Sequence, residues 1–423
     1  MSVTAPKGFR ASGVAAGLKA SRQLDVALVV NDGPDATAAG VFTANRVKAA
    51  PVLWSQQVLR AGILRAVVLN SGGANACTGP QGFQDTHATA EHTAARLTAA
   101  SRFPVGAGDI AVCSTGLIGE RLPMDKLLSG VDGAVRALSR DGGAAAAQAI
   151  MTTDTRPKSV AVAGDGYTVG GIAKGAGMLA PAMATMLCVL TTDAVVDSST
   201  LDGALREACR LTFDRVDSDG CVSTNDTVLL LASGASGIAP DPDELAMVVT
   251  EACADLARQL LADAEGSTKD IAIEVTGAVS EAQAVQVGRA VARSNLVKCA
   301  FFGNDPNWGR ILAAIGTTNA VFEADEVDVS VNGVPVCRGG AAGEDRSKVD
   351  LSGRAVRVLV DLHAGDAVPG RSVQLHAELG RSRHPDRRQR IGQIDLHEDT
   401  CRLLPAVVRR AIARRHACRR RPL

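Results

Sequence analysis

Hydrophobic residues recur every three to four positions in several long stretches of the chain, which is the pattern of amphipathic helices. The helices predicted in this way cover residues 83–100, 124–151, 199–213, 242–264 and 280–298. The pair Gly142-Gly143 is expected to interrupt the second of them. A further helix is expected to open at Ile311, after a turn-rich loop of residues 303–310.

Short apolar runs bounded by turn residues predict buried strands between these helices. They cover residues 25–31, 36–44, 63–70, 110–113, 159–163, 185–190, 271–277, 326–338 and 354–362. The first two are separated by Asp32-Gly33-Pro34, which predicts a hairpin. Because the strands return in clusters and do not alternate strictly with helices, the pattern predicts an α+β fold.

Composition narrows the class of protein. A chain of 423 residues can bury a large core and form two or more lobes. No apolar run is long enough to span a membrane without interruption, and the N-terminal stretch lacks the hydrophobic block of a secretory signal. The ten cysteines are scattered singly without a Cys-x-x-Cys pair, which argues against a zinc site and favours reduced thiols in a cytoplasm.

Charge is unevenly distributed, although the formal net charge is zero. Residues 367–423 contain 14 Arg, no Lys and 5 Asp or Glu, so this tail carries +9 and the rest of the chain −9. A basic tail is one way to bind nucleic acid or another acidic surface. An abrupt change to Arg-rich, Lys-free sequence is also expected when a GC-rich gene is read in the wrong frame, and we favour this interpretation.

Thr185 stands at the start of a predicted strand, behind the glycine-rich residues 171–177. This position suits a threonine that becomes an N-terminal nucleophile by self-cleavage. Its hydroxyl would attack the carbonyl of Ala184, and the freed α-amino group would then serve as the base for the same hydroxyl. A β-branched residue that simply opens a strand is the alternative.

Two further strand ends carry candidate chemistry. Thr115-Gly116 follows the predicted strand 110–113, where a hydroxyl and a backbone N–H could stabilise an oxyanion, although an ordinary turn has the same composition. Glu265, flanked by small residues at the end of a predicted helix, could meet a ligand ammonium or be a solvated cap. Lys174 could hold a substrate carboxylate or lower the pKa of an amine, or it could be a solvated loop lysine.

Two loops point to ligands only weakly. Residues 71–79 are glycine-rich after a strand but contain no phosphate-binding motif, so a structural or substrate-facing loop is expected. Residues 214–226 are acidic and resemble a calcium loop, but the distal Glu of such a loop is missing, so a structural role is expected there too.

Six motifs in order resemble the ornithine acetyltransferase (glutamate N-acetyltransferase) family of arginine biosynthesis. They lie at residues 114–116, 151–155, 174–178, 183–187, 263–269 and 303–310. The resemblance runs from near the N-terminus to about Asp366. It implies a layered α/β/β/α sandwich, self-cleaved between Ala184 and Thr185 into chains 1–184 and 185–423 that assemble as α2β2. The second chain would comprise a core of residues 185–366 and the tail 367–423.

The resemblance also implies the reaction. N2-acetyl-L-ornithine would acetylate Thr185, ornithine would leave, and L-glutamate would take the acetyl group. Thr115 and Gly116 match the oxyanion pair of the family, and Thr152, Lys174 and Glu265 match its substrate-binding positions. No metal or organic cofactor is implied, although bifunctional members also use acetyl-CoA as acetyl donor, and no residue here decides between the two.

The chain departs from the family after residue 366. Family members end with a segment containing a Tyr and a late Asn and Ser or Thr that help to close the substrate site, whereas residues 368–423 contain no Asn and no Tyr. Two other functions therefore stay open: a self-processing aminopeptidase or amidase, and a non-catalytic binding protein with a basic tail. We expect no membrane partner, and nucleic acid is the less favoured explanation of the tail.

Overall fold

The computed structural model describes residues 2–100, 104–178, 186–365 and 373–380. The chain divides into two compact units, Met1–Glu265 and Gly266–Leu423, and each is described by itself. Ala184 and Thr185 lie outside the described residues, as do residues 366–372 and 381–423 of the tail.

The first unit contains two sheets. One has the strand order β1-β2-β4-β5, formed by Phe9–Val14, Val26–Asn31, Ala66–Ser71 and Ile110–Thr115. The other has the order β3-β9-β8-β7-β6, formed by Ala38–Phe42, Thr227–Ala232, Leu187–Thr192, Thr168–Lys174 and Lys158–Ala163. The middle strands β2, β4, β8 and β9 are buried along their whole length and mostly apolar, because both of their faces are covered.

The hairpin predicted across Asp32-Gly33-Pro34 is wrong. The strand before it, β2, pairs with β1 and β4, whereas the strand after it, β3, pairs antiparallel with β9. Asn31, at the end of β2, donates hydrogen bonds to the carbonyls of Asp35 and Ala232, and these bonds steer the chain from one sheet into the other.

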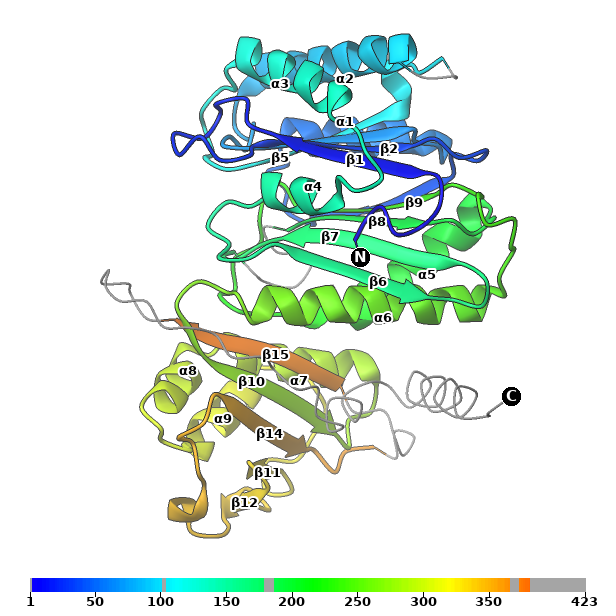
Figure 1. Ribbon diagram of the computed structural model, residues 1–423. Helices are drawn as coiled ribbons and strands as arrows, with labels where there is room; N and C mark the ends of the chain where they lie inside the picture. The colour runs from blue at the N-terminus through cyan, green and yellow to red at the C-terminus, as the bar shows by residue number, and fades with distance from the viewer. Residues whose placement is uncertain (1, 101–103, 179–185, 366–372, 381–423) are drawn as a thin grey trace. The chain divides into compact units, whose positions relative to one another are not determined.

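Helices cover the outer faces of the two sheets (Figure 1). On the first sheet lie α1 (Ala50–Val58), α2 (Gly79–Ala100) and α3 (Met124–Arg136), and on the second lie α5 (Ser198–Leu211) and α6 (Pro242–Leu261). The inner faces share one apolar core, in which Val29 and Val67 of the first sheet join Val189 and Leu229 of the second. These layers form the expected α/β/β/α sandwich.

The predicted helix 124–151 is two helices. It ends at Arg136 and resumes as α4 (Gly143–Ala149), which contacts β1 and β2 of the first sheet and β6 and β7 of the second. Gly142 and Gly143 allow the close approach, since a Cβ on Gly142 would lie 1.8 Å from the carbonyl oxygen of Ala11. The polar residues after α4 are thereby brought to the ends of both sheets.

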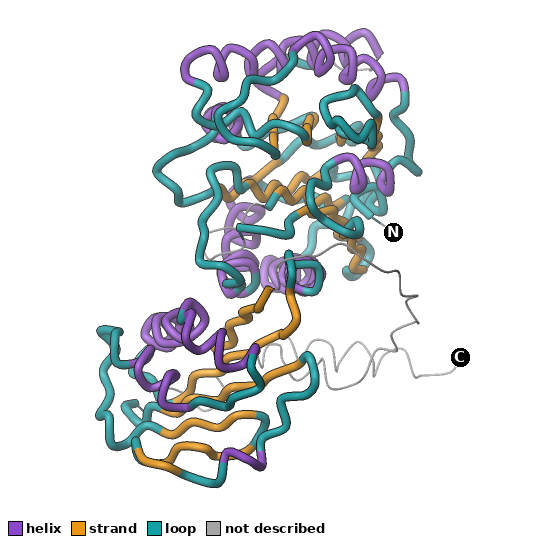
Figure 2. The backbone as a smooth tube through the Cα atoms, turned by 90° about the vertical axis from the view of Figure 1, so that its left-hand side faces the viewer, coloured by secondary structure: helices purple, strands orange, loops and turns teal. Residues whose placement is uncertain are grey.

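The second unit is one sheet with helices on one face, as Figure 2 shows. The strand order is β13-β12-β11-β14-β10-β15, formed by Ala341–Ala342, Val334–Arg338, Asp328–Val331, Ala355–Asp361, Ser267–Thr276 and Val373–Gly380. The helices are α7 (Glu281–Arg293), α8 (Asn295–Phe302) and α9 (Trp308–Ile315). Four 3-10 turns complete the described elements of the chain, at Leu59–Ala61, Ala107–Asp109, Phe213–Arg215 and Arg346–Lys348.

The predicted cleavage position falls between two neighbours in one sheet. β7 ends at Lys174 and β8 begins at Leu187, and the two strands pair antiparallel over their whole length. The expected cleavage at 184/185 therefore lies within the first compact unit, whereas the boundary between the two compact units follows Glu265. Eight residues of the Arg-rich tail, Val373–Gly380, form β15 and pair antiparallel with β10.

Candidate active site

Thr115 is the last residue of β5 and is 1% exposed. Its carbonyl accepts a hydrogen bond of 2.9 Å from the N–H of Gly72 in the neighbouring loop. A trans peptide carries its C=O and N–H on opposite sides, so the N–H of Gly116 points away from that loop. Gly116 has φ +135°, and a Cβ there would lie 2.5 Å from the nitrogen of Gly73, so only glycine fits.

Lys174 lies at the end of β7, buried beside the same strand end. Its side chain is 1% exposed, and its Nζ donates to Thr115 Oγ1 over 3.3 Å. Because the threonine oxygen accepts this bond, its own hydrogen remains available for another acceptor. The hydroxyl of Thr115 and the N–H of Gly116 are thus two donors at one strand end.

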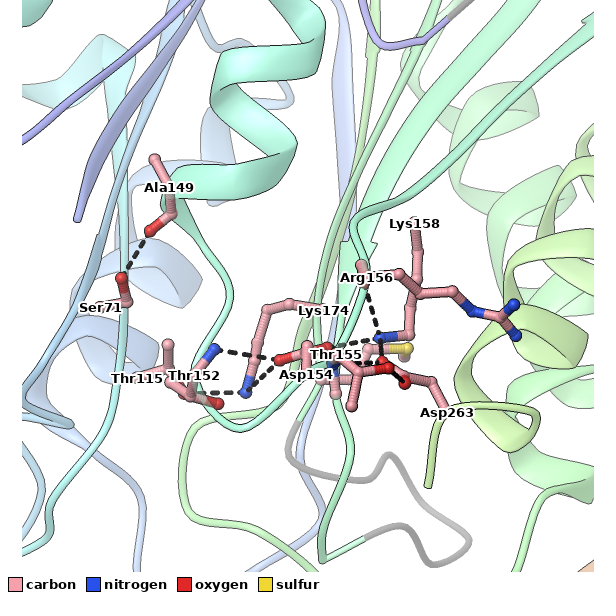
Figure 3. Close-up of polar contacts among 12 residues, drawn as sticks. Ser71, Thr115, Ala149, Thr152, Asp154, Thr155, Arg156, Lys158, Lys174 and Asp263 are labelled. Atoms are coloured by element: carbon pink, nitrogen blue, oxygen red, sulfur yellow. Dashed lines mark hydrogen bonds and ion pairs between the residues drawn. The ribbon is translucent and has the colours of Figure 1, made fainter. Parts of the chain in front are cut away.

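Asp154 gathers three segments of the site around one buried carboxylate (Figure 3). Its Oδ1 accepts hydrogen bonds from Lys158 Nζ at 2.6 Å and from the N–H of Gly175 at 2.7 Å. Its Oδ2 accepts from the N–H of Thr152 at 3.0 Å and lies 4.0 Å from Lys174 Nζ. Thr152 and Lys174, predicted as separate substrate contacts, are joined through this side chain.

Lys158 links Asp154 to a second carboxylate. The lysine is fully buried, and its Nζ also lies 2.7 Å from Asp263 Oδ2. Asp263 accepts hydrogen bonds from both the N–H and the hydroxyl of Thr155. Two lysines and two aspartates therefore share one buried network, and Asp263 stands two residues before Glu265 at the end of α6.

The network sets the charge of Lys174. Burial is the largest influence and lowers the pKa of Lys174 to about 8, with Lys158 acting in the same direction and Asp154, Asp226 and Glu265 opposing it. Burial also acts to raise the pKa of Asp154, but the two lysines and the N–H of Gly175 outweigh it, so the pKa of this carboxyl is lowered. Asp154 is therefore ionised at neutral pH, and Lys174 titrates close to that range.

Glu265 lies at the edge of this group and is exposed. Its N–H donates to the carbonyl of Ala176 over 2.7 Å, which ties the end of α6 to the glycine-rich loop after β7. A Cβ on Gly177 would lie 3.3 Å from the Glu265 carboxyl, so the loop passes directly beside that side chain. Thr152, the other predicted substrate-binding residue besides Lys174 and Glu265, is half-buried.

Met186 directly follows the predicted nucleophile, and its nitrogen belongs to the amide after Thr185. The N–H of Met186 donates to Asp226 Oδ1 over 3.0 Å, and its carbonyl accepts from the N–H of Thr227 over 3.0 Å. Asp226 ends the acidic loop for which the sequence indicated only a structural role. The sequence likewise indicated no individual role for Asp154, Lys158 and Asp263. The signal that could have found the first pair is the i, i+4 spacing of Asp154 and Lys158, which form a buried ion pair.

This geometry suits acyl transfer, in which a developing oxyanion needs hydrogen-bond donors and a carboxylate-bearing substrate needs a cation. Among the described residues, no group of three or more His, Cys, Asp or Glu side chains is placed to hold a metal ion. The helices of the same described part include none with the length and apolar character needed to cross a membrane.

Comparison with known proteins gives one consistent result. Residues 10–374 match the ArgJ family. The arginine biosynthesis bifunctional protein ArgJ of Streptomyces coelicolor is 63% identical over 367 residues, which are 87% of this chain and 94% of that protein. ArgJ of Thermobifida fusca is 64% identical over the same shares of the two chains. The solved ornithine acetyltransferase of Mycobacterium tuberculosis, complexed with ornithine, is 67% identical over 43% of this chain and 94% of its own, with a TM-score of 0.42.

Proposed function

Because the chain belongs to the ArgJ family, we propose that it is an acetyltransferase of arginine biosynthesis that moves an acetyl group from N2-acetyl-L-ornithine to L-glutamate. The match covers 94% of the Streptomyces relative, so nearly the whole length of that protein has a counterpart here. Of this chain's own features, the contact between Lys174 and Thr115 supports the proposal most directly, because it joins a cation and an oxyanion donor at one buried point.

The proposed reaction has two halves. The Oγ of Thr185 attacks the acetyl carbonyl of acetylornithine, its proton passes to the α-amino group of Thr185, and that proton then goes to the departing amine of ornithine. The amine of glutamate next attacks the acetyl-Thr185 ester, a proton passes from that amine through the α-amino group of Thr185 to the departing Oγ, and the threonine hydroxyl is restored. In both halves the Thr115 hydroxyl and the Gly116 N–H stabilise the tetrahedral oxyanion.

The remaining site residues bind the substrates in this proposal. The ammonium of Lys174 attracts a substrate carboxylate, Glu265 attracts a substrate amine, and Thr152 contacts the substrate beside them. Lys174 is held by Asp154 in a dry environment, where an ion pair with a substrate carboxylate is stronger than in water.

We further propose an α2β2 assembly of the cleaved chains 1–184 and 185–423 and a cytoplasmic location. The reaction as written needs no cofactor. Acetyl-CoA is the alternative acetyl donor, in keeping with the word bifunctional in the names of the relatives. A direct assay with acetyl-CoA and glutamate, without acetylornithine, tests that second activity.

The experiment that tests the proposal begins with a denaturing gel and the intact mass of the purified protein, beside Thr185→Ala. We expect two fragments that meet at Ala184-Thr185 in the wild type and one uncleaved chain in the variant. The cleaved protein is then assayed with acetylornithine and glutamate. Release of ornithine with formation of acetylglutamate supports the transferase, whereas equal release of acetate without glutamate indicates a hydrolase. A single wild-type band contradicts the proposed nucleophile.

The same mass measurement, made on protein expressed from the native gene, tests the frameshift interpretation of residues 367–423. A mass that includes this tail would contradict it.

A further inference from the structure

The residues Asn225-Asp226-Thr227 connect the two strands that carry the proposed chemistry. On one side, Asp226 Oδ1 and the N–H of Thr227 bind the N–H and the carbonyl of Met186, each over 3.0 Å. Since the nitrogen of Met186 is bonded to the carbonyl carbon of Thr185, the first of these bonds holds the amide that follows the nucleophile.

On the other side, the same segment binds the strand end of the oxyanion pair. Asn225 is 4% exposed, and its Nδ2 donates to the carbonyl of Ala74 at 2.6 Å and to that of Ser114 at 2.8 Å. Ser114 directly precedes Thr115. One short segment therefore makes hydrogen bonds next to Thr185 and next to Thr115.

The carboxyl of Asp226 is buried in an unusual state. The side chain is fully buried, and its Oδ2 receives no hydrogen bond within the part of the chain that the structure describes. Burial raises the pKa of Asp226 well above its usual range, against the smaller opposing effects of the Met186 N–H, Ser223 and Lys174. Burial therefore favours the protonated form of this carboxyl, and an asparagine in its place would present the same acceptor atom to Met186.

We propose that Asp226 is a positioning residue of the acyl transfer, which, together with Asn225, fixes the amide after Thr185 with respect to the strand end that bears Thr115. The inference rests on the proposed function of Thr185. Its physical basis is that a displacement of about 1 Å between reacting groups can cost a hundredfold in rate. The acidic loop 214–226 thus acts through its last residue.

The test compares an isosteric substitution with a shorter one. Asp226→Asn keeps the acceptor for Met186, so self-cleavage and kcat should stay within about threefold of the wild type. Asp226→Ser is too short to reach the Met186 N–H, and self-cleavage and kcat should both fall by about tenfold to a hundredfold. KM for acetylornithine should change little in either variant, because the proposed substrate contacts are untouched.

Asp193→Ser is the matched control. Asp193 is 3% exposed at the opposite end of β8, where it accepts hydrogen bonds from the N–H groups of Lys7 and Thr168. This control should lose stability in a thermal melt, as Asp226→Ser also should, but keep the wild-type kcat. If Asp226→Ser does not fold, the same comparison is made with Asp226→Thr, which is also too short to place an acceptor at the Oδ1 position.

Each outcome bears on the inference. Slow cleavage and low kcat in Asp226→Ser with rescue in Asp226→Asn support it. Wild-type rates in folded Asp226→Ser overturn it, as do equal losses in Asp226→Asn and Asp226→Ser, or an equal loss of kcat in the control. If the wild type itself neither cleaves at Thr185 nor transfers acetyl, it is the proposed function that fails.

Discussion

Replacing Asp154 by Asn should move the pH range in which the protein works. Asp154 Oδ2 lies 4.0 Å from Lys174 Nζ in a fully buried setting. At an effective dielectric constant of about 20, two unit charges at this distance attract by about 4 kcal/mol. This energy corresponds to about three pKa units, which is an upper limit because the network can relax. The pKa of Lys174, about 8 in the wild type, should therefore fall well below 7 in Asp154→Asn.

The sign of the effect follows from the charge of the lysine. Lys174 is an ammonium below its pKa and a neutral amine above it, so a step that needs the ammonium weakens as pH rises through that value. In the wild type, kcat/KM for acetylornithine should decline above about pH 8. In Asp154→Asn this alkaline decline should already be under way at neutral pH.

The assay is the pH profile of kcat/KM between pH 5.5 and 9.5, measured on cleaved protein at low temperature. Thermal melts of the same samples are needed, since removing one partner of a buried ion pair typically costs about 3–5 kcal/mol of stability. Asp193→Asn, which changes a buried carboxyl away from Lys174, should leave the profile where it is. An unshifted decline in folded Asp154→Asn would refute the role given to this carboxylate.

Three other substitutions test separate parts of the structure. Thr115→Val keeps the shape but removes the hydroxyl, so kcat should fall by about 10²–10³-fold with KM little changed; a kcat within threefold of the wild type would exclude the hydroxyl as an oxyanion donor. Gly116→Ala should destabilise the protein by about 1–3 kcal/mol more than Gly119→Ala in urea unfolding, because both have positive φ but a Cβ at Gly119 meets nothing within 4 Å. Lys158→Met should cost about 3–5 kcal/mol, since it leaves two buried carboxylates without their shared cation, whereas the exposed ion-paired Lys348→Met should cost at most about 1 kcal/mol.

Local patterns in the sequence predicted many of the helices and strands. The apolar run 63–70 became β4, and the periodic stretch 242–264 became α6 with Asp241 capping its first turn. The hairpin prediction failed because the choice of strand partner is not local: Ala38 and Phe42 of β3 pair with Leu231 and Thr227 of β9, far along the chain. Nothing within residues 25–44 distinguishes that partner from the nearer one.

Some residues of the site were predicted from the sequence and others were not. Thr115 and Lys174 were identified from motifs, and the structure brings them into contact. Lys158 was not, because an Asp-Lys pair in a polar stretch has the composition of a solvated loop, and its second partner, Asp263, is 105 residues further along the chain. Asp226 was not identified for a related reason, since an acidic run gives no sign that one of its members is fully buried.

The pairing of β7 with β8 also bears on the order of folding and the proposed cleavage. The two fragments would share a sheet, with Thr168–Lys174 from one hydrogen-bonded to Leu187–Thr192 from the other. Neither half made alone could complete that sheet, and each would expose unpaired strand edges that favour aggregation. If the chain is cut as proposed, the intact chain must therefore fold first and be cut afterwards. Once cut, the halves should stay together through gel filtration, exchange no partners with other molecules, and separate only in denaturant.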